Sequence, residues 1–203
     1  MIDAGTLAAG VLPVAPGMIA NVVTHLEVLA RPPALPEPAG LDLRLVALSA
    51  PDPARYRALL RRVGTPWLWH AGLERCDESL CALMSDPLTP VHALVHRGQD
   101  AGILELDFTA SGSCEIVYLG VEPGLTGSGA GRWLMNHAFE LAFARPVGRV
   151  WLHTCTLDHP AALRFYQRAG LRAFRREVEI EPDPRLTGTL PRDAAPDIPL
   201  IEP

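Results

Sequence analysis

The sequence predicts an α/β (α+β) fold, in which a mixed, mostly antiparallel sheet carries helices on its faces. Two observations lead to this prediction. Segments with alternating apolar and polar residues recur along the chain, and segments with apolar residues at helical spacing lie between them. The predicted order is one strand, two helices, three strands, a helix, a strand, a helix and a strand. The 203 residues are 48% hydrophobic and 20% charged, a composition typical of a globular protein.

Proline marks the boundaries of three parts. Residues 1–40 form an N-terminal arm, in which 20–32 alternates enough to be an extra strand and 31–40, "RPPALPEPAG", is a stiff linker. Residues 41–182 form the main domain, and 183–203 form a tail rich in Pro, Gly and Asp. The tail is expected to be ordered only by lying on the domain or on a partner. Because arm and tail could exchange between subunits, a homodimer is one expectation.

The first half of the main domain begins with a predicted strand over 41–48. A turn and N-cap signal then opens a helix over 51–64, and an aromatic loop, "TPWLWHAGL", follows it. A second helix over 76–87 is expected to be capped by Asp77 or Ser79. Strands over 91–98 and 102–111 come next, and Gln99 and Asp100 are placed at the turn between them.

The second half continues with a strand over 113–121, a helix over 128–144 and a strand over 149–157. A final helix over 158–170 has Asp158 as its expected N-cap, Pro160 in its first turn and Gly170 at its end. The segment 171–182 alternates and closes the sheet as a strand.

Charge and composition argue against several classes of partner. The formal net charge is −5 and no basic stretch is interleaved with aromatic residues, so a nucleic acid is not expected. No apolar run reaches the ~18–20 residues that span a bilayer, and the apolar N-terminus lacks a basic region, so the predicted location is cytoplasmic. The four cysteines show no metal-type spacing and are expected to be reduced.

A glycine-rich loop precedes the helix at 128–144. Gly127, Gly129 and Gly131 alternate just where a helix begins, and backbone N–H groups there attract an anion such as phosphate. A Walker A loop needs lysine, which this chain lacks, and the dinucleotide fingerprint has a different spacing. A plain tight turn between strand and helix remains an alternative interpretation.

Two motifs together identify a family. The run "VEPGLTGSGAGRWLM", followed at the usual distance by "DHPAALRFYQRAGL", resembles the GNAT superfamily of acyl-CoA-dependent N-acyltransferases. The resemblance covers about residues 41–182. It implies a sheet of six to seven strands that splays between the family's fourth and fifth strands, with four helices around it. It also implies acetyl-CoA as co-substrate and an amine as acceptor.

The resemblance further implies which residues hold acetyl-CoA. The strand 113–121 should pair with the pantetheine amides, and the loop amides should hold the pyrophosphate. Thr126 stands where the family signature has Arg or Gln, and Arg132 is a candidate to compensate for the missing cation. The candidate cofactor-binding residues are Leu119, Gly120, Val121, Thr126, Gly127, Ser128, Gly129, Ala130, Gly131, Arg132, His159 and Tyr166.

Acetyl transfer to an amine needs a proton acceptor and a proton donor. Glu115 is the candidate general base, because histone-type members carry a similar Glu-Ile-Val-aromatic run, and it is placed on one strand face with Leu119. Tyr166 occupies the family position of the general acid. A solvent-facing Glu115 and a core aromatic at Tyr166 are the structural alternatives. His153 is a lesser candidate for the base.

The acceptor site is expected near the first two helices and their loop. Trp67, Trp69 and His70 lie there and suit an apolar or cationic acceptor, although lid packing explains them equally well. Glu105 and Asp107 share one face of their strand beside Glu115. They form either a carboxylate cluster with raised pKa values, a cation-binding site or the wet face of a sheet.

Three functions remain open after this reasoning. The first is an acetyl-CoA-dependent N-acetyltransferase that moves the acetyl group directly to an amine of a small molecule or protein. The second is a catalytically degenerate acyl-CoA sensor, which the unusual Thr126 and His159 would suit. The third is a binder of another nucleotide, which competition between acetyl-CoA and ATP or NAD would expose.

Overall fold

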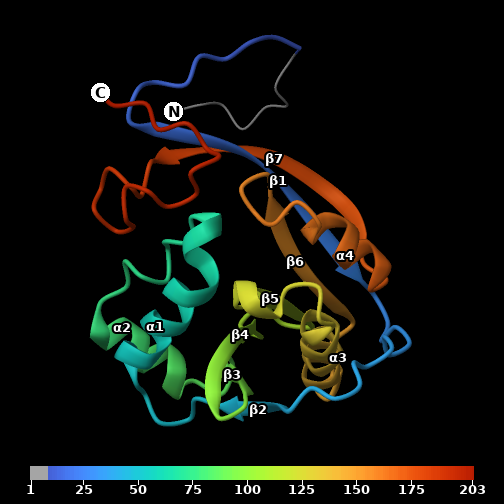
Figure 1. Cartoon of the computed structure of the whole chain (residues 1–203). Coiled ribbons are helices and arrows are strands. Elements are labelled where there is room, and N and C mark those ends of the chain that lie inside the picture. Colours follow the sequence, from blue (N-terminus) through green and yellow to red (C-terminus); the bar gives the residue numbers. More distant parts are fainter. Residues whose placement is uncertain (1–8) are drawn as a thin grey trace.

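The computed structural model describes residues 9–203, and it confirms an α/β fold built on one seven-stranded mixed sheet. The strand order is β2-β3-β4-β5-β6-β1-β7. Helices α1 and α2 cover one face of the sheet, and α3 and α4 lie on the other (Figure 1). The strands are β1 (Met18–Val28), β2 (Leu43–Ala47), β3 (Val91–His96), β4 (Gln99–Asp107), β5 (Ser113–Val121), β6 (Arg149–Cys155) and β7 (Arg172–Pro182). The α-helices are α1 (Pro53–Gly64), α2 (Asp77–Ser85), α3 (Ala130–Phe143) and α4 (Ala162–Arg168).

Strands β2 to β5 form an antiparallel meander in sequence order. The turn between β3 and β4 lies at Arg97 and Gly98, whose φ angles are 49° and 78°. The expected turn at Gln99 and Asp100 was therefore wrong, because these two residues already belong to β4. Two consecutive positive φ angles suit the right-handed twist of a tight hairpin, and Gly98 adopts one at little cost.

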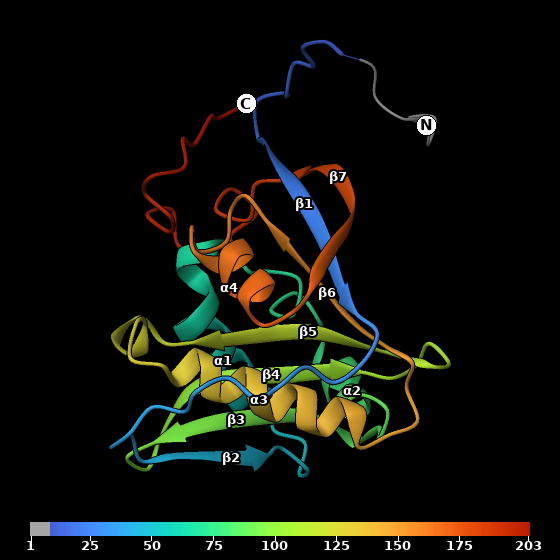
Figure 2. The ribbon, with the colours of Figure 1, turned by 90° about the vertical axis from the view of Figure 1, so that its right-hand side faces the viewer.

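The sheet splays where β5 meets β6, as expected. These two strands are parallel and pair only over Ser113–Glu115 and Arg149–Trp151. Beyond Glu115 the two strands diverge, which leaves the rest of β5 with an unpaired edge (Figure 2). The carboxyl end of β5 therefore presents free backbone groups next to the loop that leads into α3.

The arm supplies β1, an 11-residue strand that lies between β6 and β7 and is antiparallel to both. The first described strand thus joins the penultimate and last strands of the sheet. The tail also packs on its own chain. Arg185 is 3% exposed, forms an ion pair with Asp183 at 2.7 Å and donates hydrogen bonds to the carbonyls of Ala194 and Ile198.

Two helix starts differ from their predicted form. Helix α2 begins after Cys76 with no side-chain cap, so neither Asp77 nor Ser79 caps it. Helix α4 begins only at Ala162 and also lacks a side-chain cap. Asp158 was wrongly predicted as its N-cap, because its carboxylate accepts hydrogen bonds from Thr154 Oγ1 and the Cys155 backbone N–H instead. The Asp52 cap of α1 is present, with Oδ1 2.9 Å from the Arg55 nitrogen.

The linker at 31–40 runs along α3 (Figure 2). Asn136 of α3 fixes it, because its side-chain amide accepts a hydrogen bond from the Leu35 N–H at 2.8 Å and donates one to the Leu35 carbonyl at 2.9 Å. Gly129, the N-cap of α3, has a φ of 97°, and a Cβ there would lie 2.9 Å from the Pro38 Cβ. The linker and the glycine loop therefore pack against one another.

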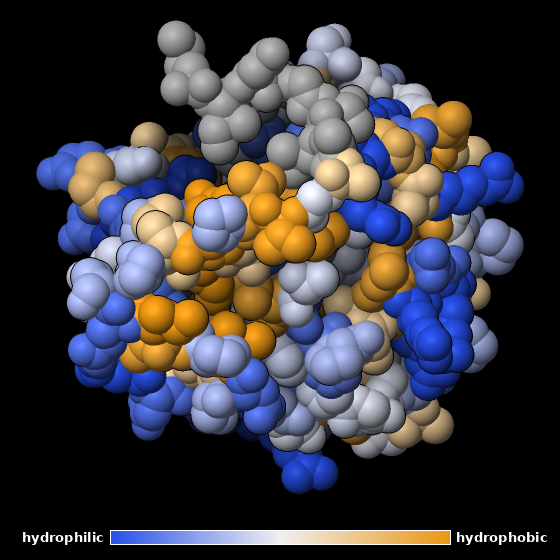
Figure 3. Space-filling model, turned by 90° about the horizontal axis from the view of Figure 1, so that it is seen from above, coloured by the Kyte–Doolittle hydropathy of each residue, from blue (hydrophilic) through white to orange (hydrophobic). Residues whose placement is uncertain are grey.

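The apolar core has two parts, one on each face of the sheet. The first part packs α3 against the sheet around Leu104, Leu106 and Leu134. The second packs α1, α2 and the tail against the opposite face, around Tyr56, Leu60 and Leu190. Apolar side chains also gather in the middle of the face that carries both termini, where the surface is hollowed (Figure 3). No helix within residues 9–203 is both long enough and apolar enough to span a bilayer.

Candidate active site

Two adjoining cavities lie beside the splay of the sheet. The first, of about 220 Å³, is a largely apolar groove between the end of β5, the glycine loop and α4, and we call it the loop groove. The second, of about 190 Å³, is lined by polar groups of β1, β6 and β7, and we call it the acidic pocket. The two cavities share five lining residues, namely Trp67, Trp69, Leu119, Asp158 and Tyr166. The two cavities therefore adjoin at these residues.

Most of the predicted cofactor-binding residues line the loop groove. Gly127 has a φ of 79°, and the space where a Cβ would lie is empty, so a ligand can approach this backbone closely. The short 3-10 helix at Pro123–Leu125 shapes the other wall. The predicted residues that line the groove are Leu119, Gly120, Val121, Thr126, Gly127, Gly131, His159 and Tyr166.

Four predicted cofactor residues are not part of this lining: Ser128, Gly129, Ala130 and Arg132. Ser128 Oγ donates to the Leu125 carbonyl at 2.6 Å and accepts from the Ala130 N–H at 3.2 Å, so it fixes the loop geometry. Gly129 makes room for the linker. The sequence alone could not separate these supporting roles from direct contact with a ligand. The motif is recognised as a whole and does not show which of its residues face the groove.

His159 lies on the α4 side of the groove. Its ring meets the Trp67 ring edge-on, with centroids 5.1 Å apart, and its Nδ1 accepts a hydrogen bond from the Ala161 N–H at 3.0 Å. Because the Nδ1 atom accepts, the proton of a neutral ring is on Nε2. His159 thus helps to form the turn before α4 while one edge of its ring lines the groove.

A β-bulge changes the predicted faces of β5. Ile116 pairs with Leu106 and Tyr118 pairs with Glu105, so Val117 is the extra residue. After the bulge the alternation is reversed, and Glu115 and Leu119 lie on opposite faces. The prediction that they share a face was wrong, because a bulge shifts the two-residue period by one and leaves no mark in the sequence pattern.

Glu115 faces His153 of β6. Its Oε1 lies 3.3 Å from His153 Nδ1, and this hydrogen bond is the main cause that raises the pKa of His153 above its usual value. His153 lines the acidic pocket, whereas Glu115 stands behind it and retains 22% exposure of its side chain. The pair brings a carboxylate and an imidazole together beside the cavity that Tyr166 also reaches.

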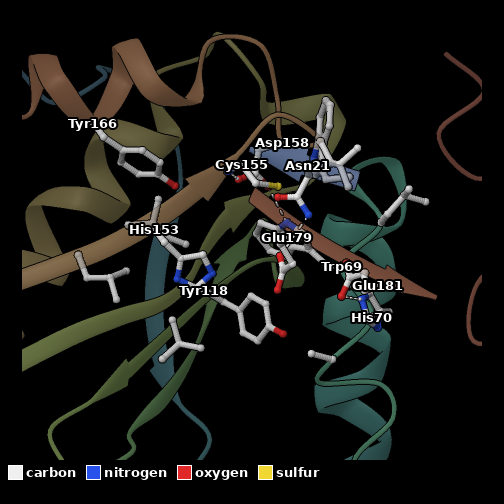
Figure 4. A pocket seen from close by; sticks show the side chains of 17 residues that line it. Asn21, Trp69, His70, Tyr118, His153, Cys155, Asp158, Tyr166, Glu179 and Glu181 are labelled. Carbon is white, nitrogen blue, oxygen red and sulfur yellow. Dashed lines mark hydrogen bonds and ion pairs between the residues drawn. The ribbon is translucent and has the colours of Figure 1, made fainter. Parts of the chain in front are cut away.

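Tyr166 projects from α4 toward the space beside His153 (Figure 4). It lines both cavities, and burial, with a smaller effect of Asp158, raises the pKa of its hydroxyl. A tyrosine with a raised pKa keeps its proton at neutral pH. The side chain is therefore poised as a hydrogen-bond donor where the two cavities meet.

The other two predicted carboxylates stay outside both cavities. Glu105 is 3% exposed and accepts a 2.7 Å hydrogen bond from the Tyr56 hydroxyl. Burial raises the pKa of Glu105, with smaller contributions from Asp107 and Glu115. Asp107 lies opposite Glu115 in the register and accepts from the Thr109 N–H at 2.6 Å. The three carboxylates are neighbours, as expected, but Glu105 supports α1 from within the core.

The aromatic loop supplies the wall between the cavities. Trp69 Nε1 donates to Asp158 Oδ1 at 2.9 Å, and its ring lies 5.1 Å from the Tyr118 ring. His70 Nε2 lies 3.2 Å from Glu181, and its Nδ1 lies 3.1 Å from Glu74. The hydrogen bond to Glu181 is the main cause that raises the pKa of His70. Trp67, Trp69 and His70, the three loop residues predicted for the acceptor site, all line the acidic pocket.

The sequence analysis missed the residues that β1 and β7 contribute. Asn21 is 4% exposed, and its Nδ2 donates to Glu179 Oε2 at 3.1 Å. Glu179 and Glu181 alternate along β7 and both line the acidic pocket, as does Tyr118 (Figure 4). The alternation of Glu177, Glu179 and Glu181 was visible in the sequence. Only the insertion of β1 between β6 and β7 reveals that this face borders the pocket.

The remaining candidate reactive groups are the cysteine thiols and the side chains that can bind a metal ion. Cys155 lines the acidic pocket, but burial raises the pKa of its thiol to about 11. Burial also raises the pKa of the Cys114 thiol to about 12. Within residues 9–203 no group of His, Cys, Asp and Glu side chains is arranged to hold a metal ion.

Comparisons with known proteins agree with this architecture. The model of the acetyltransferase (GNAT) family matches residues 59–171, more than half of the chain. A GCN5-related N-acetyltransferase from Sphaerobacter thermophilus has a similar structure, with a TM-score of 0.59 and 22% identity over 83% of this chain and 52% of that one. This chain thus spans about half the length of that protein. No curated protein sequence matches this chain.

Two further solved structures show the same fold. An acetyltransferase of the GNAT family from Novosphingobium aromaticivorans gives a TM-score of 0.57 at 20% identity, over 82% of this chain and 68% of that one. An aminoglycoside acetyltransferase from an uncultured soil metagenomic sample, solved with trehalose, gives 0.53 at 17%, over 63% of this chain and 86% of that one. The family match and the splayed sheet together lead to one conclusion: the chain belongs to the GNAT family of acetyltransferases.

Proposed function

We propose that this protein is an acetyl-CoA-dependent N-acetyltransferase that transfers the acetyl group directly to the amine of a small molecule or protein. The observation that carries the proposal is that the loop groove and the acidic pocket adjoin, with Tyr166 in the lining of both. One cavity suits a long, largely apolar arm that ends in phosphates. The other suits a cationic acceptor.

The loop groove supports the choice of acetyl-CoA. The free edge of β5 at Leu119 to Val121 offers backbone groups to the pantetheine amides, and the N-terminus of α3 offers unpaired N–H groups to the pyrophosphate. Thr126 replaces the family's Arg or Gln and removes a possible donor, which we expect to weaken phosphate binding. Because Arg132 is not part of the groove lining, the backbone carries most of the phosphate contact.

The residues between the cavities support a direct transfer. The acceptor ammonium must first lose a proton, and in our proposal Glu115 takes it through His153, which lines the pocket. The amine nitrogen then bonds to the acetyl carbon as the carbon–sulfur bond breaks. Tyr166 donates its proton to the departing thiolate, and the acylated nitrogen then loses its second proton to the Tyr166 phenolate, which leaves a neutral amide. The backbone N–H of Leu119 or Gly120 is the proposed contact for the carbonyl oxygen.

The cysteines favour this route over an acyl-cysteine intermediate. With a thiol pKa of about 11, Cys155 is thiolate in only ~1 of 10,000 molecules at pH 7. Burial without a cationic partner therefore leaves no effective sulfur nucleophile in the acidic pocket. The aminoglycoside acetyltransferase among the similar structures is consistent with a small, amine-bearing acceptor.

Thermal unfolding of the full chain with acetyl-CoA, CoA, ATP and NAD tests the co-substrate. A ligand at one hundred times its Kd stabilises the native state by about 2.7 kcal/mol, so acetyl-CoA and CoA should raise Tm and the others should not. Equal stabilisation by ATP or NAD would instead support a binder of another nucleotide.

Release of free thiol with a panel of amines then tests the chemistry. We expect Glu115→Gln and Tyr166→Phe each to lower kcat by about a hundredfold or more, while acetyl-CoA still raises Tm. A wild-type chain that binds acetyl-CoA but acetylates no amine would support the alternative of an acyl-CoA sensor.

We also propose that the chain divides into three parts at residues 40 and 182 and that the protein is located in the cytoplasm.

A further inference from the structure

The acidic pocket contains one carboxylate, Glu179, that has a single hydrogen-bond donor and no ion-pair partner among the described residues. Asp158 accepts hydrogen bonds from Trp69, Thr154 and Cys155, Glu181 faces His70, and Glu115 behind the pocket faces His153. Glu179 accepts only the Asn21 amide and forms no ion pair within residues 9–203. It thus places a carboxylate with few partners at the cavity wall, where it also favours the protonated form of His153.

Asn21 supplies a second and independent observation. A carboxylate only accepts hydrogen bonds, so the bond to Glu179 fixes the orientation of the Asn21 amide, with the NH₂ group toward Glu179. Its carbonyl oxygen, Oδ1, is then buried without any partner. A buried acceptor of this kind destabilises the fold unless a donor reaches it. Asn21 itself lines the acidic pocket (Figure 4).

From this arrangement we infer that Asn21 and Glu179 form a subsite for a second ammonium group of the acceptor, which makes the acceptor a diamine or polyamine. This inference rests on the proposed function. An ammonium carries three N–H donors, so it can pair with the Glu179 carboxylate and satisfy the Asn21 carbonyl at once. The rings of Trp67, Trp69 and Tyr118 around the same cavity add favourable contacts to a cation.

The subsite suits the amine that does not react. A carboxylate stabilises the protonated form of a neighbouring amine, and a protonated amine is no nucleophile. The reacting amine must instead lose its proton near His153 and Tyr166. Glu179 also contributes to the raised pKa of His153, so the two places are close. A short spacer between the two amino groups fits this proximity.

The subsite also lies outside the part of the chain that the family model describes. That match covers residues 59–171, whereas Asn21 is in β1 and Glu179 is in β7. These two strands reach the pocket only because β1 inserts between β6 and β7. The proposed subsite is thus built from two strands that lie outside residues 59–171.

The test compares diamines with monoamines of matched length, both as substrates and as ligands. Putrescine, cadaverine and spermidine are measured against butylamine and pentylamine by kcat/KM and, in the presence of CoA, by calorimetric Kd. In the wild type we expect the diamines to be favoured by about tenfold or more, as for a charge-assisted hydrogen bond. Glu179→Gln keeps an acceptor for Asn21 but removes the charge. It should reduce the kcat/KM and the affinity for diamines to the values for monoamines.

Glu177→Gln is the matched control, because Glu177 lies two residues away on β7, pairs with His25 and does not line the pocket. It should leave the diamine preference unchanged. Asn21→Ala changes the part of the subsite that β1 contributes, and it should also weaken diamine binding. The subsite would be overturned if the wild type had equal kcat/KM and Kd for diamines and monoamines. It would also be overturned if Glu179→Gln weakened the binding and turnover of both kinds of amine equally. Diamine binding that depends on Glu179 without any turnover would support the subsite and refute the proposed function.

Discussion

At the residue scale, the pairing of Glu115 with His153 has a direct electrostatic consequence. The Glu115 carboxylate stabilises the protonated imidazole, which holds the pKa of His153 above its ordinary value of about 6.5. In Glu115→Gln we expect the His153 pKa to fall toward that value. NMR titration of the His153 ring protons measures the change without depending on turnover.

His70 serves as the control in the same titration. Glu181 and Glu74 raise its pKa, and Glu115 is not among the causes. Its titration should be the same in wild type and variant. An unchanged His153 titration in Glu115→Gln would contradict the pairing and, with it, the route proposed for the amine proton.

His70 gives a second residue-scale prediction. Its folded pKa is raised by Glu181 and Glu74, so its contribution to stability is fully present below about pH 6.5 and is lost as pH rises through the folded pKa. His70→Gln should therefore remove part of the fall in unfolding free energy as the pH rises above about 6.5. Urea unfolding at several pH values measures it. An identical pH dependence in both proteins would show that the Glu181 contact is weak.

At the element scale, the start of α3 depends on Gly129, which belongs to the glycine loop and also makes room for the linker at 31–40. Gly129 has a φ of 97°, and a Cβ there would lie 2.9 Å from Pro38. We expect Gly129→Ala to destabilise the fold by about 1–3 kcal/mol, because the backbone is strained and the linker must shift. Gly124→Ala is the control, since nothing lies within 4 Å of its added Cβ and its φ is not positive.

Denaturant unfolding of both variants measures this difference. Equal midpoints for Gly129→Ala and Gly124→Ala would mean that the linker at 31–40 is free to move away. Acetyl-CoA binding by the folded Gly129→Ala variant should be weaker as well, because the same strain displaces the N–H groups at the beginning of α3.

At the scale of the whole molecule, the tail is tied to the domain by a buried ion pair. Asp183 and Arg185 are each 3% exposed, and Arg185 also donates to the carbonyls of Ala194 and Ile198. Removal of one partner leaves the other charge buried and unpaired, so Arg185→Met should cost about 3–5 kcal/mol of unfolding free energy. The double variant Asp183→Asn with Arg185→Met should recover part of this loss.

The same pair sets an acid limit for the fold. Arg185 is the main cause that lowers the pKa of Asp183, so its contribution is present above about pH 4 and is lost as pH falls through the folded pKa. Asp183→Asn should flatten that part of the acid unfolding curve, and a curve as steep as that of the wild type would contradict the pairing.

The arm and the tail pack on their own chain in this structure. The homodimer therefore stays a prediction, and light scattering of the full chain tests it.

The sequence by itself determined the elements and the family. Alternation, helical spacing and the two motifs around Gly127 and Tyr166 are local patterns, and each predicted strand and helix is present, with ends that differ from the predicted ones by up to four residues. Three features depended on tertiary structure: the bulge at Val117, the place of β1 beside β7, and the pairing of Glu115 with His153. Each of them joins residues far apart in the chain through sheet register and packing, which no local pattern encodes. The acidic pocket therefore depends on the topology of the sheet, whereas the glycine loop beside the loop groove could be predicted from the order of the residues.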